Sequence, residues 1–156
     1  MTAPIAPPRP RRILAVASIG GHWEQMMLLR PAFEGCEVHF ATSNDGLGAR
    51  EGLNTYLLPD TNRHHPWLTL LCAWRAFHVV RRVRPDVVIS TGAAPGLMCI
   101  VMGRLFGART LWIDSIANAG RISGSGRMAR RIATRTLTQW EHLSAEPGIG
   151  FAGRVL

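Results

Sequence analysis

A glycine-rich turn that contains a histidine follows the first apolar stretch of the chain. The turn reads Ser-Ile-Gly-Gly-His-Trp-Glu over residues 18–24, after the apolar run 13–17. An amphipathic segment comes next, so the pattern predicts a buried strand, a turn and a helix start. Backbone N–H groups at a helix start bind phosphate or diphosphate well. Together with the His22 imidazole they indicate chemistry on a phosphate-bearing substrate; the alternative is a tight turn without a ligand, which needs glycine only for its backbone angles.

Two later loops occupy the same place after an apolar strand. Residues 90–96, Ser-Thr-Gly-Ala-Ala-Pro-Gly, have small side chains that let either a ligand or another loop approach closely. Asp114 and Ser115 end a further strand, where a carboxylate can orient a sugar hydroxyl, act as a base, or cap a turn or helix. Neither glycine loop is the dinucleotide fingerprint G-x-G-x-x-G, and neither is a P-loop, because no Gly-Lys-Ser/Thr follows.

Strands and helices alternate along the chain, and this order predicts an α/β fold with a Rossmann-like, doubly wound parallel sheet. Strands are expected at 13–18, 37–42, 55–58, 87–90, 110–113 and 135–139, with a last short strand within 148–156. Helices are expected at 23–33, 66–84, 97–106 and 127–134, with a loop or short helix at 44–52. Ligands bind beyond the carboxyl ends of strands in such sheets. The loops 18–22 and 91–96 and the stretch after Asp114 should therefore share one edge.

The composition indicates one domain, residues 13–156, after a Pro- and Arg-rich tail, residues 1–12, that we expect to be disordered. The 156 residues carry a formal charge of +8, and all 18 basic residues are arginines. Such a charge favours an acidic partner: nucleic acid, anionic lipid or a phosphorylated ligand. Nucleic acid is disfavoured because the arginines are dispersed and no recognition motif occurs. Cys36, Cys72 and Cys99 show neither metal-ligand spacing nor a disulfide framework, which favours a reducing cytosol.

No segment has the roughly 20 mostly apolar residues that a membrane span needs. The best candidate, residues 67–83, is interrupted by three arginines and a histidine. Apolar side chains recur at helical spacing in it: Trp67, Leu70, Leu71, Trp74, Phe77 and Val80. The segment is thus either a helix that lies on an anionic membrane surface or an ordinary core-facing helix. Similarly, the arginines of the segment 127–135 either contact phosphates or form a solvated face.

Five motifs in series resemble a known family. They are Ser18-x-Gly-Gly-His22, Pro85-Asp-Val-Val-Ile-Ser-Thr-Gly92, Trp112-Ile-Asp-Ser115, Arg121-x-Ser123 with Gly126, and Thr138-Gln-Trp-Glu141. This series is similar to the membrane-associated, acceptor-binding subunit of the two-part UDP-N-acetylglucosamine transferase of dolichol-linked oligosaccharide assembly. It is more similar still to the bacterial PssD-type subunits of exopolysaccharide synthesis, and MurG is a single-chain relative. The resemblance covers residues 12–141, and only the ordered series is specific. Its one departure in a motif is Asp114, where the family usually has glutamate.

The resemblance implies the N-terminal half of a GT-B glycosyltransferase, which binds a polyprenyl-diphosphate-linked saccharide. The UDP-sugar then belongs to a separate donor-binding subunit, and a chain of 156 residues has room for one such domain. The family further implies inverting transfer without metal or cofactor, at the cytoplasmic face of the inner or plasma membrane. Animal and fungal members often carry an N-terminal membrane helix, whereas the N-terminal segment here is polar.

The resemblance also suggests roles for individual residues. His22 is a candidate base that deprotonates the acceptor hydroxyl; alternatively it binds the diphosphate, and Asp114 acts as base or orients the sugar. Candidates for binding the acceptor and its diphosphate are Ser18, Gly20, Gly21, Thr91, Gly92, Gly96, Ser115, Arg121 and Ser123. Candidates that face the partner or the donor are Gln139, Trp140 and Glu141.

The resemblance implies that the transferred sugar is either N-acetylglucosamine or glucuronic acid. Two other functions stay open at this point. The chain could be a non-catalytic scaffold that recruits the donor-binding subunit to the membrane, or a nucleotide-binding α/β protein that acts alone.

Overall fold

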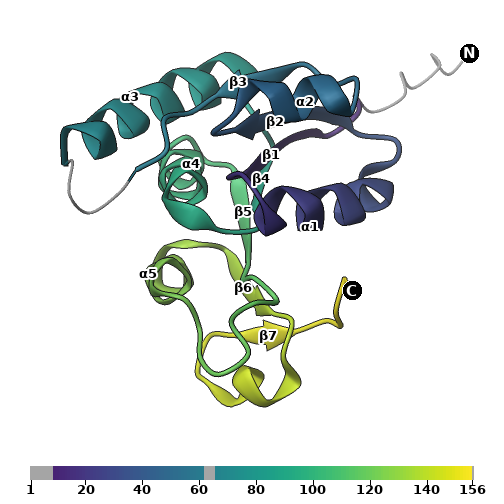
Figure 1. The fold of residues 1–156 in the computed structure, drawn as a ribbon, viewed down its shortest axis with the longest axis vertical. Helices are drawn as coiled ribbons and strands as arrows, with labels where there is room; N and C mark the ends of the chain where they lie inside the picture. The colour runs from purple at the N-terminus through teal and green to yellow at the C-terminus, as the bar shows by residue number, and fades with distance from the viewer. Residues whose placement is uncertain (1–8, 62–65, 156) are drawn as a thin grey trace, which may run out of the picture.

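A seven-stranded parallel sheet organises the chain in the computed structural model, which describes residues 9–61 and 66–155 (Figure 1). The strands are β1 (Arg12–Ala17), β2 (Glu37–Thr42), β3 (Thr55–Leu57), β4 (Val87–Ser90), β5 (Arg109–Ile113), β6 (Arg135–Thr138) and β7 (Gly150–Phe151). Their order across the sheet is β3-β2-β1-β4-β5-β6-β7, and every neighbouring pair is parallel. The predicted Rossmann-like, doubly wound fold is therefore confirmed.

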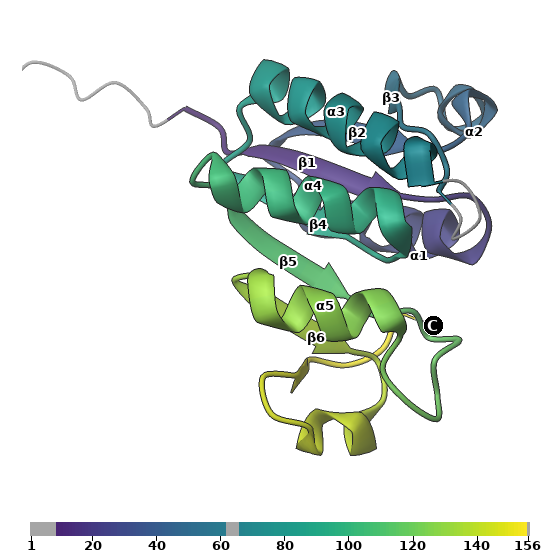
Figure 2. The same cartoon turned by 90° about the vertical axis from the view of Figure 1, so that its left-hand side faces the viewer.

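Helices cover both faces of this sheet. They are α1 (Gly21–Leu29), α2 (Asp45–Arg50), α3 (Pro66–Val83), α4 (Ala93–Leu105) and α5 (Gly124–Ile132), with short 3₁₀ segments η1 (Arg30–Phe33) and η2 (Glu141–Ala145). Helices α3, α4 and α5 lie side by side on one face, and α1 and α2 lie on the other (Figures 1 and 2). Each helix begins near the carboxyl ends of the strands, because it leaves a strand there and runs back across the sheet.

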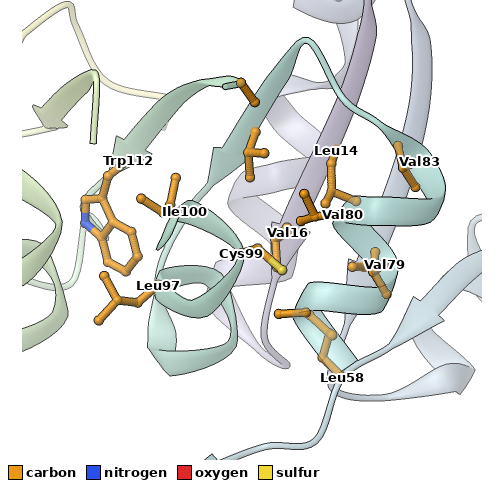
Figure 3. Packing of buried hydrophobic residues seen from close by; sticks show 14 of the residues in the cluster. Leu14, Val16, Leu58, Val79, Val80, Val83, Leu97, Cys99, Ile100 and Trp112 are labelled. Atoms are coloured by element: carbon orange, nitrogen blue, oxygen red, sulfur yellow. The ribbon is translucent and has the colours of Figure 1, made fainter. Parts of the chain in front are cut away.

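The alternation of side chains along β1 explains the two apolar layers. Leu14 and Val16 point to one face and join the cluster formed with α3, α4 and α5, which Figure 3 shows in part. Ile13, Ala15 and Ala17 point to the other face and pack against Trp23, Met26 and Phe33. A strand that is buried on both faces reads as a continuous apolar run, which is why residues 13–17 predict a central strand.

Three helices begin earlier than the sequence pattern predicts: α1 by two residues, α4 by four and α5 by three. Helix α4 begins at Ala93 rather than residue 97, so the expected turn 91–96 contains its first helical turn. Gly96 belongs to that turn and faces the sheet, since a Cβ on it would overlap Ser90 Oγ. Helix α5 begins at Gly124 rather than residue 127, with Ser123 as its N-cap. By composition, the small residues at the starts of α4 and α5 predict a loop. In the structure, Gly96 and Gly126 let these helix starts pack closely against neighbouring side chains.

The structure describes residues 9–12, which belong to the segment expected to be a tail. Arg12 opens β1, and the Arg9 guanidinium pairs with the Asp86 carboxylate at 2.7 Å. This hydrogen-bonded pair holds the pKa of Asp86 below its ordinary value. The rest of the predicted disordered tail, residues 1–8, lies outside the described residues.

Candidate functional site

The central strands β1 and β4 separate the two directions in which the chain is wound. After β1 the chain forms α1 on one face, and after β4 it forms α4 on the opposite face (Figure 2). Such a switch point leaves a crevice at the carboxyl ends of the two strands, where doubly wound proteins bind ligands. The glycine turn that carries His22 and the Thr91–Gly92 turn meet there, as the sequence predicts.

A hydrogen bond between these two turns fixes the tautomer of the neutral His22 ring. The Nδ1 atom lies 2.9 Å from the Thr91 carbonyl oxygen. A carbonyl only accepts, so Nδ1 carries the hydrogen, and Nε2 of the neutral ring keeps its lone pair. In return, Thr91 Oγ1 donates to the His22 carbonyl oxygen at 2.7 Å. This reciprocal pair orients a half-buried imidazole whose free nitrogen can accept a proton.

The backbone of the Gly92–Ala93 turn makes room for that ring. Gly92 has φ 142°, and a Cβ at this position would overlap the His22 imidazole. Ala93 has φ 66°, a left-handed conformation that costs a non-glycine residue roughly 1–2 kcal/mol. Ala93 also lines the groove beside His22. Strain of this kind is typical of functional sites, where the surrounding structure holds it in place.

A groove of about 1070 Å³ opens beside His22. The starts of α1, α4 and α5 border it, together with the first turns of α3. Its positively charged lining residues are Arg127, Arg130 and Arg131, and none of its described lining residues is acidic. Arg131 makes no ion pair within the described part of the chain, whereas Arg130 pairs with Glu146 at 3.2 Å. The groove therefore suits an anionic ligand.

The helix starts at this groove supply further groups for an anion. The N–H groups in the first turn of any helix have no partner inside the helix. Among the described residues, no side chain caps α1 at Gly20 or α4 at Gly92. In contrast, Ser123 caps α5 by accepting from Gly126 N at 2.8 Å. Free N–H groups at two neighbouring helix starts can bind the oxygens of a phosphate or diphosphate.

Asp114 is buried and fully engaged. It is 1% exposed, and its two oxygens accept four hydrogen bonds. The donors are Trp112 Nε1 (3.1 Å), Asn118 Nδ2 (3.3 Å), Ser123 N (2.9 Å) and Ser123 Oγ (2.5 Å). Its side chain thus holds the loop 115–123 and the start of α5 in place. A base or a sugar-orienting group would need an oxygen that is free to meet the substrate.

Gly126 belongs to the same arrangement. A Cβ on it would lie 2.7 Å from Asp114 Oδ1 and 2.9 Å from Ser123 Oγ. The motif Arg121-x-Ser123 with Gly126 therefore encodes a capped helix start packed against a carboxylate. Arg121 itself is exposed on the loop.

Gln139 lies in the interior. It is 2% exposed, and its Nε2 donates to Gln25 Oε1 at 2.7 Å and to the Asp114 carbonyl at 3.1 Å. Gln25 in turn donates to Ser115 Oγ at 3.1 Å. Gln139 Oε1 accepts from the Val155 backbone at 3.2 Å. Since its side chain is fully used inside the domain, Gln139 joins α1, the loop after β5 and the C-terminal segment instead of facing a partner.

The residues after Gln139 hold the same loop from outside. Trp140 Nε1 donates to the Ile116 carbonyl at 2.7 Å, and a ring nitrogen of His142 lies 2.8 Å from the Ala119 carbonyl. The Arg154 guanidinium lies over the Trp140 ring at 4.6 Å. Of the three residues expected to face the partner or donor, only Glu141 has an exposed side chain.

The structure thus divides the predicted site residues into two groups. His22 and Ser123 line the groove and Gly92 lies against the His22 ring, while Gly20 and Gly21 are exposed in the turn that carries His22. The others expected to bind the acceptor are buried or lie away from the groove: Ser18, Thr91, Gly96, Ser115 and Arg121. The sequence did not point to Asn118, which donates to Asp114, or to Gln25, which joins Ser115 and Gln139. A polar residue inside the apolar stretch 23–29 was the available signal for Gln25.

The buried cysteines take no part in this site. Cys72 of α3 and Cys99 of α4 are fully buried, and Cys99 belongs to the apolar cluster between the sheet and these helices. Burial raises the pKa of the Cys72 thiol to about 11, and it raises the pKa of Cys99 further. Both thiols therefore stay protonated at neutral pH and pack as small hydrophobic groups.

Solved structures share this fold, although no family profile matches the sequence and no curated protein matches it. MurG from Acinetobacter baumannii superposes with a TM-score of 0.76 at 15% identity, over 92% of this chain and 46% of that one. A glycosyltransferase from Rickettsia africae superposes with a TM-score of 0.68 at 16% identity, over 93% and 43% of the two chains. The S. aureus MnaA–UDP structure superposes with a TM-score of 0.72 at 13% identity, over 93% of this chain and 44% of that one.

These similarities establish the fold of the chain. It is that of the N-terminal half of a GT-B glycosyltransferase, a fold that UDP-N-acetylglucosamine 2-epimerases also match. The chain spans about half the length of each of these proteins.

Proposed function

We propose that the chain is the acceptor-binding subunit of a two-component, inverting glycosyltransferase. The donor would be a UDP-sugar held by a second subunit, with N-acetylglucosamine or glucuronic acid as the sugar. The acceptor would be a saccharide on a polyprenyl diphosphate, as in the synthesis of polysaccharides or lipid-linked oligosaccharides. No resident metal or cofactor is part of the proposal.

One observation carries this proposal: an oriented imidazole lies beside a basic groove into which three helices begin. His22, Ala93 and Ser123, each from a different helix start, line the same groove as Arg127 and Arg131. A diphosphate matches the free N–H groups and the guanidinium charges. The fold adds support, because glycosyltransferases are among its matches and the chain spans about half of them.

In this account the residues have separate roles. The N–H groups at the starts of α1 and α4 bind the diphosphate, and the groove arginines add positive charge. Nε2 of His22 accepts the proton of the acceptor hydroxyl as that oxygen attacks the anomeric carbon of the donor sugar. UDP leaves as the C–O bond to its phosphate breaks, and the configuration inverts. Asp114 is a positioning residue, because three of its four hydrogen bonds hold the loop and the start of α5 and the fourth comes from Trp112 of β5.

The exposed side of α3 supports peripheral contact with an anionic membrane. No helix in the described ranges is both long and apolar enough to cross a bilayer. Four large apolar side chains of α3 are exposed: Trp67 (59%), Leu70 (73%), Leu71 (37%) and Trp74 (57%). Exposed arginines follow on the same helix: Arg75, Arg81 and Arg82. Apolar side chains that insert shallowly and arginines that meet lipid phosphates are the features of an interfacial helix.

The subunit assignment predicts that the purified chain has no transferase activity alone. The missing component would bind the UDP-sugar, so the product of an adjacent gene that encodes a UDP-sugar-binding half is the protein to co-express. The assay offers a sugar-diphosphate-lipid acceptor with a panel of UDP-sugars. We expect transfer only with both proteins present. Robust transfer by this chain alone would contradict the two-component assignment.

A further inference from the structure

The groove beside His22 changes character along its length. Its end at the helix starts is polar, with His22, Asn118 and Ser123. One to two helical turns further along α4 and α5, a strip of four apolar side chains lines the groove beside the arginines of α5: Leu97, Met98, Met128 and Ile132. Four residues of helix advance about 6 Å, so the apolar strip begins directly beyond the anion-binding end. An anion site that continues along an apolar strip fits an amphiphile with a charged head.

We propose that this strip binds the isoprene units next to the diphosphate of the acceptor, so that the chain recognises the lipid as well as the head group. The inference rests on the proposed function for the identity of the head group. It adds a lipid-specificity site formed by Met98 and Met128, which the transferase assignment by itself does not require.

The side chains of the strip suit a flexible hydrocarbon chain. Met98 is half-buried and Met128 is 55% exposed, although both are apolar. Methionine is unbranched and polarizable, so it adapts to an irregular apolar ligand. Arg127 and Arg131 lie on the same helix as Met128 and line the same groove. Their guanidinium groups place positive charge beside the apolar strip, where the phosphates of an isoprenyl diphosphate would lie.

The first turn of α3 also borders the groove and joins it to the exposed apolar side of this helix. Thr69 lines the groove, and its neighbour Leu70 is 73% exposed. At 100° per residue, Leu70 and Phe77 lie within about 20° of each other around the helix. The Phe77 ring packs against Phe106 of the α4 end at 5.5 Å, so this side of α3 turns toward α4. An isoprenyl chain that leaves the groove would therefore pass over Leu70 toward the surface we propose as membrane-facing.

Binding of soluble isoprenyl diphosphates to the purified chain tests this site without any partner. The ligands are inorganic pyrophosphate, geranyl diphosphate and farnesyl diphosphate, each below its micelle-forming concentration, measured by isothermal titration calorimetry. We expect farnesyl diphosphate to bind at least about tenfold tighter than pyrophosphate, the effect of burying roughly two methylene groups. Equal affinities for all three ligands, or no binding of any, would overturn the proposal.

Substitutions locate the binding strip. Met128→Gln and Met98→Gln should each weaken farnesyl diphosphate binding by roughly threefold or more and leave pyrophosphate binding unchanged. Leu105→Gln is the matched control, because Leu105 is 74% exposed and lies at the other end of α4. Unchanged farnesyl affinity in both methionine variants would place the lipid elsewhere.

The outcome separates this inference from the function on which it rests. With both subunits present, transfer to a methyl-diphosphate-linked sugar with the same KM as its farnesyl counterpart would support the transferase and reject the lipid site. Absent transfer with intact, Met128-dependent farnesyl binding would reject the transferase and keep the lipid site.

Discussion

Replacing His22 by alanine should lower transferase turnover at least ~100-fold, the low end for loss of a general base. The reason is the orientation of the ring: Thr91 accepts from Nδ1 at 2.9 Å, so only Nε2 can take the acceptor proton. The measurement is kcat and KM of the two-subunit enzyme at saturating UDP-sugar. Association of the subunits, followed by size-exclusion chromatography, should stay unchanged.

His22→Asn is the sharper variant. The asparagine N–H can reproduce the donor at the Nδ1 position, so the bond to Thr91 is kept while the Nε2 lone pair is lost. We expect kcat to fall as far as in His22→Ala. His39→Ala is the control, because His39 is a half-buried histidine on β2 that contacts Glu37 instead. A raised KM with unchanged kcat in both His22 variants would make His22 a diphosphate ligand and remove it from proton transfer.

Asp114→Ala should lower the free energy of unfolding by about 3 kcal/mol. The substitution leaves four donors without their acceptor in a site that is 1% exposed, and each buried unsatisfied group costs roughly 1–3 kcal/mol, although water can enter to reach some of them. Urea denaturation followed by circular dichroism measures the change. Asp45→Ala is the control: Asp45 is an exposed acid in the first turn of α2, worth roughly 0.3–1 kcal/mol there.

Asp114→Asn refines this test. One amide nitrogen would face donors that now meet an oxygen, so we expect a loss of about 1–2 kcal/mol, less than for alanine. If both Asp114 variants were as stable as the unsubstituted chain and inactive only in transfer, the positioning role would be wrong. Asp114 would then be available to the substrate.

The strands and the parallel, doubly wound class of the sheet could be predicted, because each strand has a local sequence pattern. Residues 13–17 and 87–90 are short, mostly apolar runs with glycine or proline a few residues away. Such runs are typical of buried parallel strands. The first residues of the helices were harder to predict. Small residues such as those at 93–96 predict a loop by composition, but here they let α4 approach Ser90. The sequence does not say which partner a small residue makes room for.

Prediction of the site residues has the same limit, because the sequence does not specify their partners. The place of His22 at the edge of the sheet could be predicted, because a turn after a buried strand has a known position in this fold. The roles of Asp114 and Gln139 could not. Both are polar residues at strand ends, and their burial depends on contacts with Ser123, Gln25 and Val155, which are 9 to 114 residues away in sequence. Long-range partners decide whether a polar side chain faces the ligand or holds a loop.

Binding of donor and acceptor to the isolated chain tests the central claim most directly. The two ligands are farnesyl-diphosphate-N-acetylglucosamine and UDP-N-acetylglucosamine, measured by isothermal titration calorimetry under the same conditions. An acceptor-binding half should bind the lipid-linked sugar and show no measurable affinity for the nucleotide sugar. Tight binding of UDP-N-acetylglucosamine without binding of the lipid-linked sugar would contradict the account and favour a nucleotide-binding protein that acts alone.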